Sequence, residues 1–196
     1  MPPEDPGADH GQGFAHLGDD ERFRGWRISV VDARFQAPDG STFHRDIVRH
    51  PGAVAVVPVT GRGTAVLVRQ YRGALDRWML EIPAGTRDVD DEAPETTAAR
   101  ELEEEAGVRA GHLEHLATIA NTPGFCDELT ELYLATDLTE ATAARHGHEE
   151  ERIEVVEVAL DDVDAMVEDG RLVDAQTVLG LLLARARLAS GMPGRP

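Results

Sequence analysis

Three glutamates in the middle of the chain, Glu101, Glu104 and Glu105, are spaced so that they share one face of an α-helix. Like charges on one helix face repel each other unless a cation lies among them. Carboxylate oxygens are the ligands that hard cations such as Mg²⁺ and Mn²⁺ prefer. The spacing therefore predicts a divalent-metal site, and such a metal beside a cleft of nucleotide size indicates phosphate chemistry.

Two further charged residues accompany these glutamates. Arg100 precedes Glu104 by four residues and can brace a carboxylate through a charge-assisted hydrogen bond, and Glu92 is a candidate partner that fixes Arg100. Glu103 falls on the far side of the helix and is expected to be solvated. A salt-bridged surface helix is the alternative interpretation, and composition alone favours it because acidic helices are common.

The helix that carries the glutamates is predicted to run from Pro94 to Ala106. Proline suits the first helical turn, and Gly107 suits the position just past the end. Ala98, Leu102 and Ala106 form its apolar face, which is expected to pack inward. The acidic face then points away from the core.

Apolar and alternating runs predict strands on both sides of this helix. The continuous apolar run Val54–Val59 is typical of a strand buried on both faces. Two more helices are expected near 161–168 and 174–189, so the fold class is an α/β or α+β sandwich, a mixed sheet with helices packed on it. The expected strands are 26–35, 41–49, 54–59, 65–70, 78–82, 112–119, 129–135 and 153–159.

Composition bounds the function. A chain of 196 residues is expected to form one domain, or one domain with an appendage. Its net charge of -18 gives a surface that repels nucleic acid and anionic lipid, so neither is an expected partner. The single cysteine, Cys126, cannot form an intrachain disulfide. Residues 1–20 are acidic and rich in Pro and Gly, which predicts a disordered tail rather than a secretion signal. Because the apolar runs are too short to span a membrane, a cytoplasmic location is expected.

The segment from Gly85 to Val108 resembles the Nudix box. That pattern is Gly, five residues, Glu, seven residues, Arg-Glu, an aliphatic residue, any residue, Glu-Glu, any residue, Gly and an aliphatic residue. Every fixed position from Arg100 to Val108 matches, and seven residues separate Glu92 from Arg100. The first spacer has six residues, and the additional one falls in the loop before the helix, where insertions are tolerated.

This resemblance implies the Nudix fold, a mixed β-sheet sandwiched between helices, and hydrolysis of a nucleoside diphosphate linked to another moiety. Residues 21–50 are expected to form an N-terminal β-hairpin extension, 51–190 the Nudix hydrolase domain and 191–196 a C-terminal tail. By position in the motif, Glu101, Glu104 and Glu105 are the implied metal ligands, and the Ala84 carbonyl completes the metal shell. Arg100 and Glu92 are the implied orienting pair.

Outside the box the chain resembles the ADP-ribose pyrophosphatase branch of the family. Four pieces carry the likeness: Val68–Arg72 with Trp78–Gly85, Thr122–Glu128, His148–Ile153, and Gly170–Thr177. Together they make ADP-ribose the leading substrate, with AMP and ribose 5-phosphate as products and Mg²⁺ or Mn²⁺ as cofactor.

Hydrolysis of a diphosphate also needs a proton acceptor on a second loop. The acidic run Glu149, Glu150 and Glu151 supplies candidates, of which Glu149 is the predicted base and Glu151 an accessory metal contact. The alternative is that this run is only a solvated loop.

Arginines are the natural phosphate ligands, because a guanidinium binds phosphate in two-pronged fashion. Arg72 and Arg45 are the predicted phosphate or ribose contacts, although both could equally be surface charges and Arg49 lies near Arg45 on the same hairpin. Glu81 is predicted either to touch the base or ribose or to be a buried structural acid.

Aromatic residues offer a surface for the adenine. Phe23 or Trp26 could stack on the base, although an aromatic near the start of a strand is more often part of the core. Phe125 is a further candidate for substrate contact, with a plug beneath its loop as the alternative. In relatives the N-terminal hairpin reaches a partner subunit, which implies a homodimer with composite sites.

Three other functions compete with hydrolysis of ADP-ribose. Another nucleoside diphosphate sugar, such as GDP-mannose or ADP-glucose, could be the substrate. Some Nudix domains only sense a nucleotide, but those usually have a damaged box or an attached DNA-binding domain. A purely structural acidic protein leaves the motif unexplained.

Overall fold

The structure, a computed structural model, describes residues 13–89, 91–143 and 150–191. It divides the chain into two units. Unit 1 comprises Met1–Pro51 and Thr122–Glu128, and unit 2 comprises Gly52–Asn121 and Leu129–Pro196. Among the helices of these described ranges, none combines the length and the apolar character that crossing a membrane requires.

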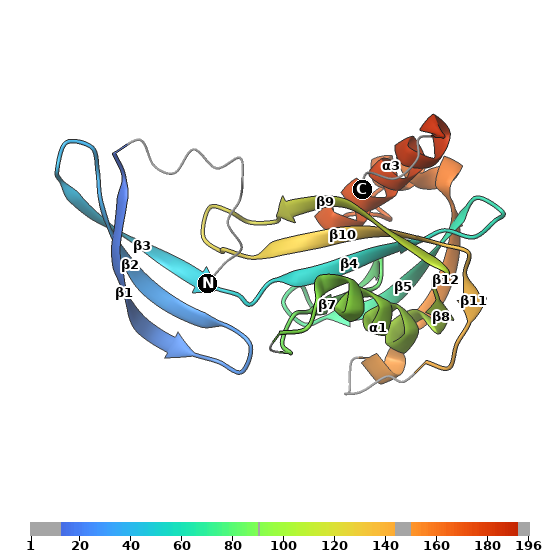
Figure 1. The fold of residues 1–196 in the computed structure, drawn as a ribbon, viewed down its shortest axis with the longest axis horizontal. Coiled ribbons are helices and arrows are strands. Elements are labelled where there is room, and N and C mark those ends of the chain that lie inside the picture. Colours follow the sequence, from blue (N-terminus) through green and yellow to red (C-terminus); the bar gives the residue numbers. More distant parts are fainter. Residues whose placement is uncertain (1–12, 90, 144–149, 192–196) are drawn as a thin grey trace. The chain divides into compact units, whose positions relative to one another are not determined.

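Unit 1 is built on a three-stranded antiparallel sheet in the order β1-β2-β3 (Figure 1). Its strands are β1 (Ala15–Arg24), β2 (Ser29–Gln36) and β3 (Thr42–Arg49). The sequence predicted only the second and third of these, and it placed residues 15–20 in a disordered tail. That part of the prediction is wrong, and β2 begins three residues later than the predicted strand.

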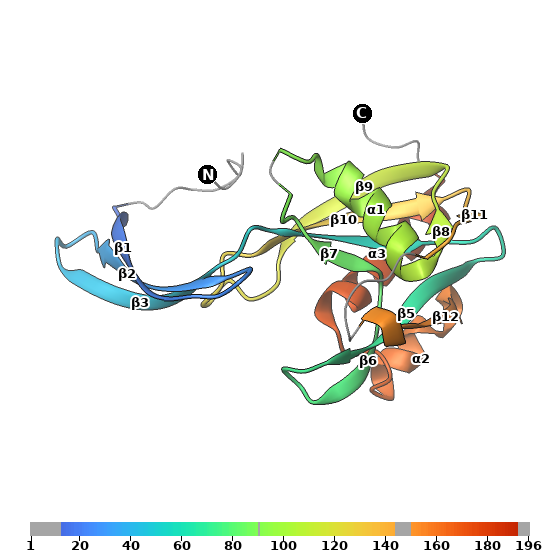
Figure 2. The same cartoon turned by 90° about the horizontal axis from the view of Figure 1, so that it is seen from below.

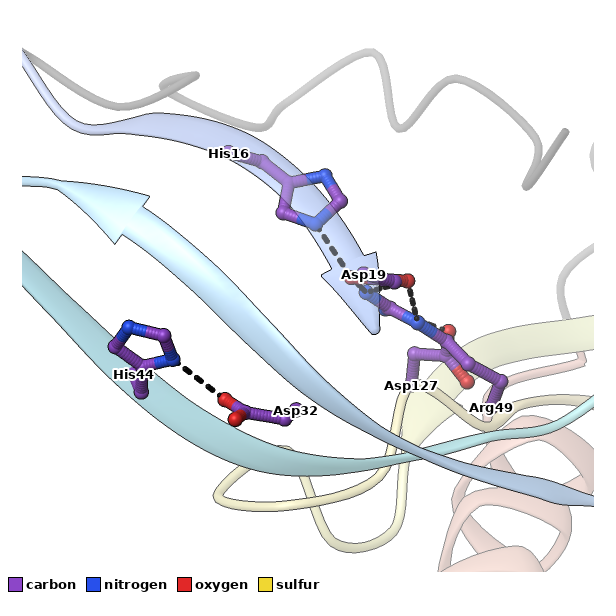
Figure 3. A network of polar contacts seen from close by, with 6 residues as sticks. All are labelled: His16, Asp19, Asp32, His44, Arg49 and Asp127. Atoms are coloured by element: carbon purple, nitrogen blue, oxygen red, sulfur yellow. Dashed lines mark hydrogen bonds and ion pairs between the residues drawn. The ribbon is translucent and has the colours of Figure 1, made fainter. Parts of the chain in front are cut away.

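The strand β1 was not predicted because it has no buried face and therefore no alternation of apolar and polar residues. All but one of its residues are exposed. Charge pairs support its backbone pairing. Asp19 accepts hydrogen bonds from Arg49 Nε and Nη2 at 2.9 and 3.0 Å and contacts His16 Nε2 at 2.6 Å (Figure 3). Arg49 Nη1 also donates to Asp127 at 3.0 Å, which ties the 122–128 loop to β3 within this unit.

Unit 2 contains two main sheets and one short two-stranded pair. The first sheet has the order β7-β4-β10-β9 and is mixed, because β10 runs parallel to β4 while the other neighbours are antiparallel. The second has the order β12-β5-β6 and is antiparallel. The strands of unit 2 are β4 (Ala53–Pro58), β5 (Thr64–Arg72), β6 (Arg77–Glu81), β7 (Ala84–Thr86), β8 (Val108–Arg109), β9 (His112–Ala120), β10 (Leu129–Thr136), β11 (Thr139–Glu140) and β12 (Glu154–Ala159).

The central strand β4 is buried along its whole length, which confirms the sequence prediction. Its side chains alternate between two core clusters, as the pleat of a strand requires. Val54 and Val56 pack in the cluster that contains Leu102 of α1 (Pro94–Ala106), whereas Ala55 and Val57 pack in the one that contains Leu181 of α3 (Ala175–Ser190). The mixed sheet therefore lies between helices, the predicted sandwich, and Figure 2 shows α1 lying over the strands.

The helix α1 has the predicted bounds and the predicted inward face, since Ala98 and Leu102 are fully buried and Ala106 is 6% exposed. Gly107 ends it in a left-handed conformation with φ 66°, and its N–H donates to the Glu103 carbonyl. The remaining short helices are η1 (Glu150–Arg152), η2 (Leu160–Asp162) and α2 (Val163–Glu168).

Candidate active site

The acidic face of α1 lies against the backbone that leaves β6. Gly85 of β7 is the point of closest approach: a Cβ atom placed on it would lie 2.0 Å from Glu101 Cδ and 2.2 Å from Glu101 Oε1. A side chain there would overlap the carboxylate, so the glycine gives Glu101 room to lie directly on the backbone. The Nudix-like pairing of Gly85 with Glu101 thus has a steric cause.

Glu105 meets the same segment one residue earlier. Its Oε2 accepts a hydrogen bond of 3.0 Å from the Ala84 backbone N–H, and the residue is only 6% exposed. Glu101 and Glu105 therefore converge on two consecutive backbone residues, Ala84 and Gly85, while Glu104 is the more exposed of the three, with 29% of its side chain accessible.

Arg100 holds the acidic face together. Its Nη1 lies 2.8 Å from Glu101 Oε1 and donates to Glu104 Oε2 at 3.1 Å, and its Nη2 lies 3.5 Å from Glu92 Oε2. Thr97 fixes Glu92 in turn through a 2.7 Å hydrogen bond from Oγ1. Burial works to lower the pKa of Arg100, but the charges of Glu101, Glu104 and Glu92 outweigh it and raise that pKa, so the guanidinium stays charged.

A second charge pair joins a buried acid, Glu81, to the partly exposed Arg72. Glu81 is 2% exposed, and its carboxylate accepts from Arg72 Nε at 3.0 Å and from Gln70 Nε2 at 3.0 Å. Burial lowers the pKa of Arg72, whereas the hydrogen bonds to Glu81 and the charges of Glu81, Glu105 and Asp174 raise it, with a net rise. Glu81 is therefore a buried acid held by Arg72, one of the two possibilities that the sequence left open.

The donor set of the α1 face suits a hard divalent cation. Three carboxylates and the Ala84–Gly85 backbone supply only oxygen donors, and the space that Gly85 keeps clear is occupied by one of those carboxylates. In the described ranges no three His, Cys, Asp or Glu side chains are already grouped closely enough to hold a metal. Arg100 contacts Glu101 Oε1 and Glu104 Oε2, one oxygen of each carboxylate, and would hold these two side chains beside a bound metal.

The predicted residues of the acidic loop fall at the edge of the described structure. Glu149 lies outside the described residues. Glu151 lies in η1 and is exposed. Glu103, which was expected to be solvated, has 32% of its side chain exposed. Arg109 donates to its carboxylate at 2.7 and 2.8 Å, and this hydrogen bonding lowers the pKa of Glu103.

The other predicted substrate contacts belong to unit 1, whereas α1, Arg72 and Glu81 belong to unit 2. Arg45 is exposed on β3, where its guanidinium lies 4.8 Å from the Phe43 ring centroid. Trp26 is 96% exposed and Phe125 is 56% exposed, so neither is a core residue. The alternatives that made Trp26 part of the core and Phe125 a plug are therefore wrong, and so is the core alternative for Phe23, which is 58% exposed.

Some residues around the acidic face were not singled out as site residues from the sequence. Gln70 is 4% exposed and binds Glu81, and Thr177 is fully buried and binds the backbone of Ile82. Gln70 follows Val66 and Val68 at alternate positions of one strand, which could have drawn attention to it, because a buried amide requires a partner. Thr177 gave no comparable signal, since it lies 95 residues from its partner.

The NUDIX domain family model matches residues 48–178 of this chain. The match spans more than half of the chain and includes β4, the β6–β7 segment and the whole of α1. The chain belongs to the NUDIX domain family, and it is a Nudix hydrolase.

Two proteins are similar to this chain in sequence, and one solved structure is similar to it in fold. The chain is 40% identical to an ADP-ribose pyrophosphatase of Bacillus subtilis (strain 168) over 159 residues, 81% of this chain and 85% of that protein. It is also 40% identical to a methanol dehydrogenase activator of Bacillus methanolicus over 155 residues, 79% of this chain and 82% of that protein. A crystal structure of an ADP compounds hydrolase superposes with a TM-score of 0.78 at 23% identity, covering 93% of this chain and 98% of that one, which supports the fold.

Proposed function

We propose that this protein hydrolyses the diphosphate linkage of ADP-ribose to AMP and ribose 5-phosphate, with Mg²⁺ as its cofactor and Mn²⁺ as a substitute. The observation that carries the proposal is the convergence of Glu101 and Glu105 on the Ala84–Gly85 backbone. A solvated carboxylate on a surface helix would not require a glycine at the backbone position that it contacts. The 40% identity to an ADP-ribose pyrophosphatase supports the choice of substrate.

Within this proposal, Glu101, Glu104, Glu105 and the Ala84 carbonyl would hold the metal. When bound, a divalent metal neutralises charge on the diphosphate and stabilises the charge that develops in hydrolysis. Arg100 keeps the carboxylates of α1 in one place through the contacts described above.

Arg72 is proposed to bind a phosphate. Its Nε and Nη2 donate to Glu81, which fixes the plane of the guanidinium, and within the described residues its Nη1 makes no hydrogen bond. A guanidinium held in this way offers a positive charge without loss of side-chain freedom when the substrate binds. Arg45, Trp26 and Phe125 stay candidate contacts to the substrate, supplied by unit 1.

Glu149 is proposed as the general base and Glu151 as an accessory metal contact. The test is Glu149→Gln, which is expected to lower turnover while the affinity for Mn²⁺, measured by calorimetric titration, changes little. Loss of Mn²⁺ binding in this variant would instead make Glu149 a metal ligand.

We also propose a cytoplasmic homodimer that forms through unit 1. The support is an aromatic cluster on its sheet, in which the rings of Phe35 and Phe43 stack at 5.4 Å and Phe14, 56% exposed, meets Phe43 edge-on at 6.2 Å. Light scattering should give a mass near twice 21.3 kDa, and Phe14→Asp should lower it toward one chain. An unchanged mass in Phe14→Asp would place the interface elsewhere.

A substrate panel tests the proposed reaction. The purified protein is incubated with ADP-ribose, ADP-glucose and GDP-mannose, with Mg²⁺ or with EDTA, and the products are identified by mass. ADP-ribose is expected to give AMP and ribose 5-phosphate only with the metal. Faster cleavage of another nucleotide sugar would change the substrate, and no cleavage of any would reject the proposed hydrolysis of nucleotide sugars. Oxygen-18 water in the same assay identifies the phosphorus that is attacked.

A further inference from the structure

The backbone that carries the candidate site is anchored at successive residues. The Pro83 carbonyl accepts a 2.9 Å hydrogen bond from Val56 N, the Ala84 N–H donates to Glu105, and Gly85 lies on Glu101. The residue before them, Ile82, is fully buried and donates its backbone N–H to Thr177 Oγ1 at 3.0 Å. The N-terminal turn of α3 therefore holds the strand end that delivers Ala84 and Gly85 to the carboxylates.

The two hydrogen bonds of the Thr177 hydroxyl have a fixed direction. Because the Ile82 N–H is a donor, Oγ1 must accept from it, and the hydroxyl proton is then directed to Asp174 Oδ2 at 2.6 Å. Asp174 is the N-cap of α3 and accepts the Thr177 backbone N–H at 2.8 Å as well. The carboxylate thus fixes both the start of the helix and the direction of the hydroxyl.

Asp174 also faces the other charge pair of the site. Its charge is among those that raise the pKa of Arg72, which binds Glu81, the residue next to Ile82. Asp174 therefore affects this segment in two ways. It orients the Thr177 hydroxyl that binds the Ile82 backbone, and its negative charge favours the charged form of Arg72, which binds the Glu81 side chain.

We propose that Thr177, oriented by Asp174, is a positioning residue of the hydrolytic site, which sets the place of Ala84 and Gly85 against Glu105 and Glu101. This inference rests on the proposed diphosphate hydrolysis. It assigns a role to the Asp174-Ala-Gln-Thr177 sequence at the start of α3. Ala84 lies only two residues from the anchored amide, so a shift of Ile82 is expected to displace the Ala84 backbone.

The decisive variant is Thr177→Val, which keeps the shape of the side chain and removes the acceptor. Thr177→Ser restores the hydroxyl. Thr130→Val is the matched control, because Thr130 is equally buried in unit 2 and its Oγ1 accepts a 3.0 Å hydrogen bond from Asn121. Each variant is measured for kcat and KM with ADP-ribose, for thermal stability, and for hydrogen exchange of the Ile82 and Ala84 amides.

A positioning role predicts a fall in kcat of tenfold or more in Thr177→Val with KM nearly unchanged, and faster exchange at Ala84. Thr177→Ser should recover most of both. Thr130→Val should lower thermal stability to a similar degree and leave kcat as it is. If Thr177→Val loses stability but keeps the wild-type kcat and Ala84 exchange, Thr177 is only structural and the inference is overturned.

If Thr177→Val does not fold, Asp174→Ala, which frees the hydroxyl without removing it, must show the same loss of kcat and the same faster Ala84 exchange, or the inference fails. If the wild-type protein cleaves no nucleotide sugar, the proposed function fails. Exchange at Ala84 then decides alone whether Thr177 positions this backbone.

Discussion

Replacing Gly85 by alanine tests the geometry of the site most sharply. The new Cβ would lie 2.0 Å from Glu101 Cδ and 2.4 Å from Glu101 Cγ, where ordinary contact begins at 3.4 Å. Gly85 does not adopt a left-handed backbone, so alanine meets no conformational strain of its own. The Glu101 carboxylate must therefore retreat by more than about 1 Å, and a misplacement of that size costs about 10²-fold in rate.

Turnover and stability should respond differently to Gly85→Ala. A 10²-fold fall in kcat corresponds to about 2.7 kcal/mol of barrier height. The fold should lose little, because the clash is with a flexible side chain and alanine reduces the entropy of the unfolded chain, a gain of about 0.4–1 kcal/mol. The assay follows AMP release from ADP-ribose at saturating Mg²⁺, with thermal unfolding measured on the same samples.

Two controls isolate the cause. Gly61→Ala adds the same methyl group at an exposed turn where nothing lies within 4 Å, and it should leave kcat and stability unchanged. In a Glu101→Ala background the clash is gone, so Gly85→Ala should cause no further loss of activity. A Gly85→Ala enzyme that keeps more than about a third of the wild-type kcat refutes the reasoning, since the expected loss is about 10²-fold. A further large loss in the double variant would show that Gly85 acts independently of Glu101.

Three further predictions concern the helix and unit 1. Glu104→Gln should lower kcat by about 10²-fold or more while thermal stability is kept, because its partly exposed side chain faces the site and metal stabilisation of a transition state is worth several kcal/mol; near-normal turnover would contradict its assignment. Leu102→Asp should cost about 4 kcal/mol or more in urea unfolding because it buries an unpaired charge at a fully buried position, and a cooperatively folded variant would contradict the helix orientation. Burial raises the pKa of Asp19, but hydrogen bonds from His16 and Arg49 outweigh it and lower that pKa below 3.8. The pairing therefore stabilises unit 1 above pH 3.8 and is lost as the pH falls through the lower, folded-state pKa; NMR titration should show the Asp19 pKa rising in Arg49→Met, and no rise would exclude the pair as the cause.

The sequence predicted the fold best where local chemistry decides it. The bounds of α1 follow from Pro94 and Gly107, whose backbone preferences act at those positions whatever the rest of the chain does. The burial of β4 follows from its unbroken apolar run. The spacing of the motif likewise predicts that Glu101 and Glu105 share one face, because helical periodicity fixes that relation.

Features that depend on contacts between distant segments could not be predicted from the sequence. The polar strand β1 is held by the contact between Asp19 and Arg49, which lie 30 residues apart. It lacks the alternation of apolar residues that predicts a strand. Thr177 is recognisable as part of a helix start, but its partner Ile82 follows only from the packing of α3 on the sheet. For Glu81 the sequence left open a contact with the base or ribose and a buried structural acid; its 2% exposure and its contact with Arg72 depend on packing that the sequence does not show.

The most direct test is a crystal grown with Mn²⁺ and a methylene-bridged analogue of ADP-ribose, with the metal located by its anomalous scattering. Mn²⁺ is expected within about 2.0–2.3 Å of oxygens of Glu101, Glu104 or Glu105, with the bridged diphosphate bound to it. The account would be contradicted if the metal and the analogue bound away from Glu101, Glu104 and Glu105.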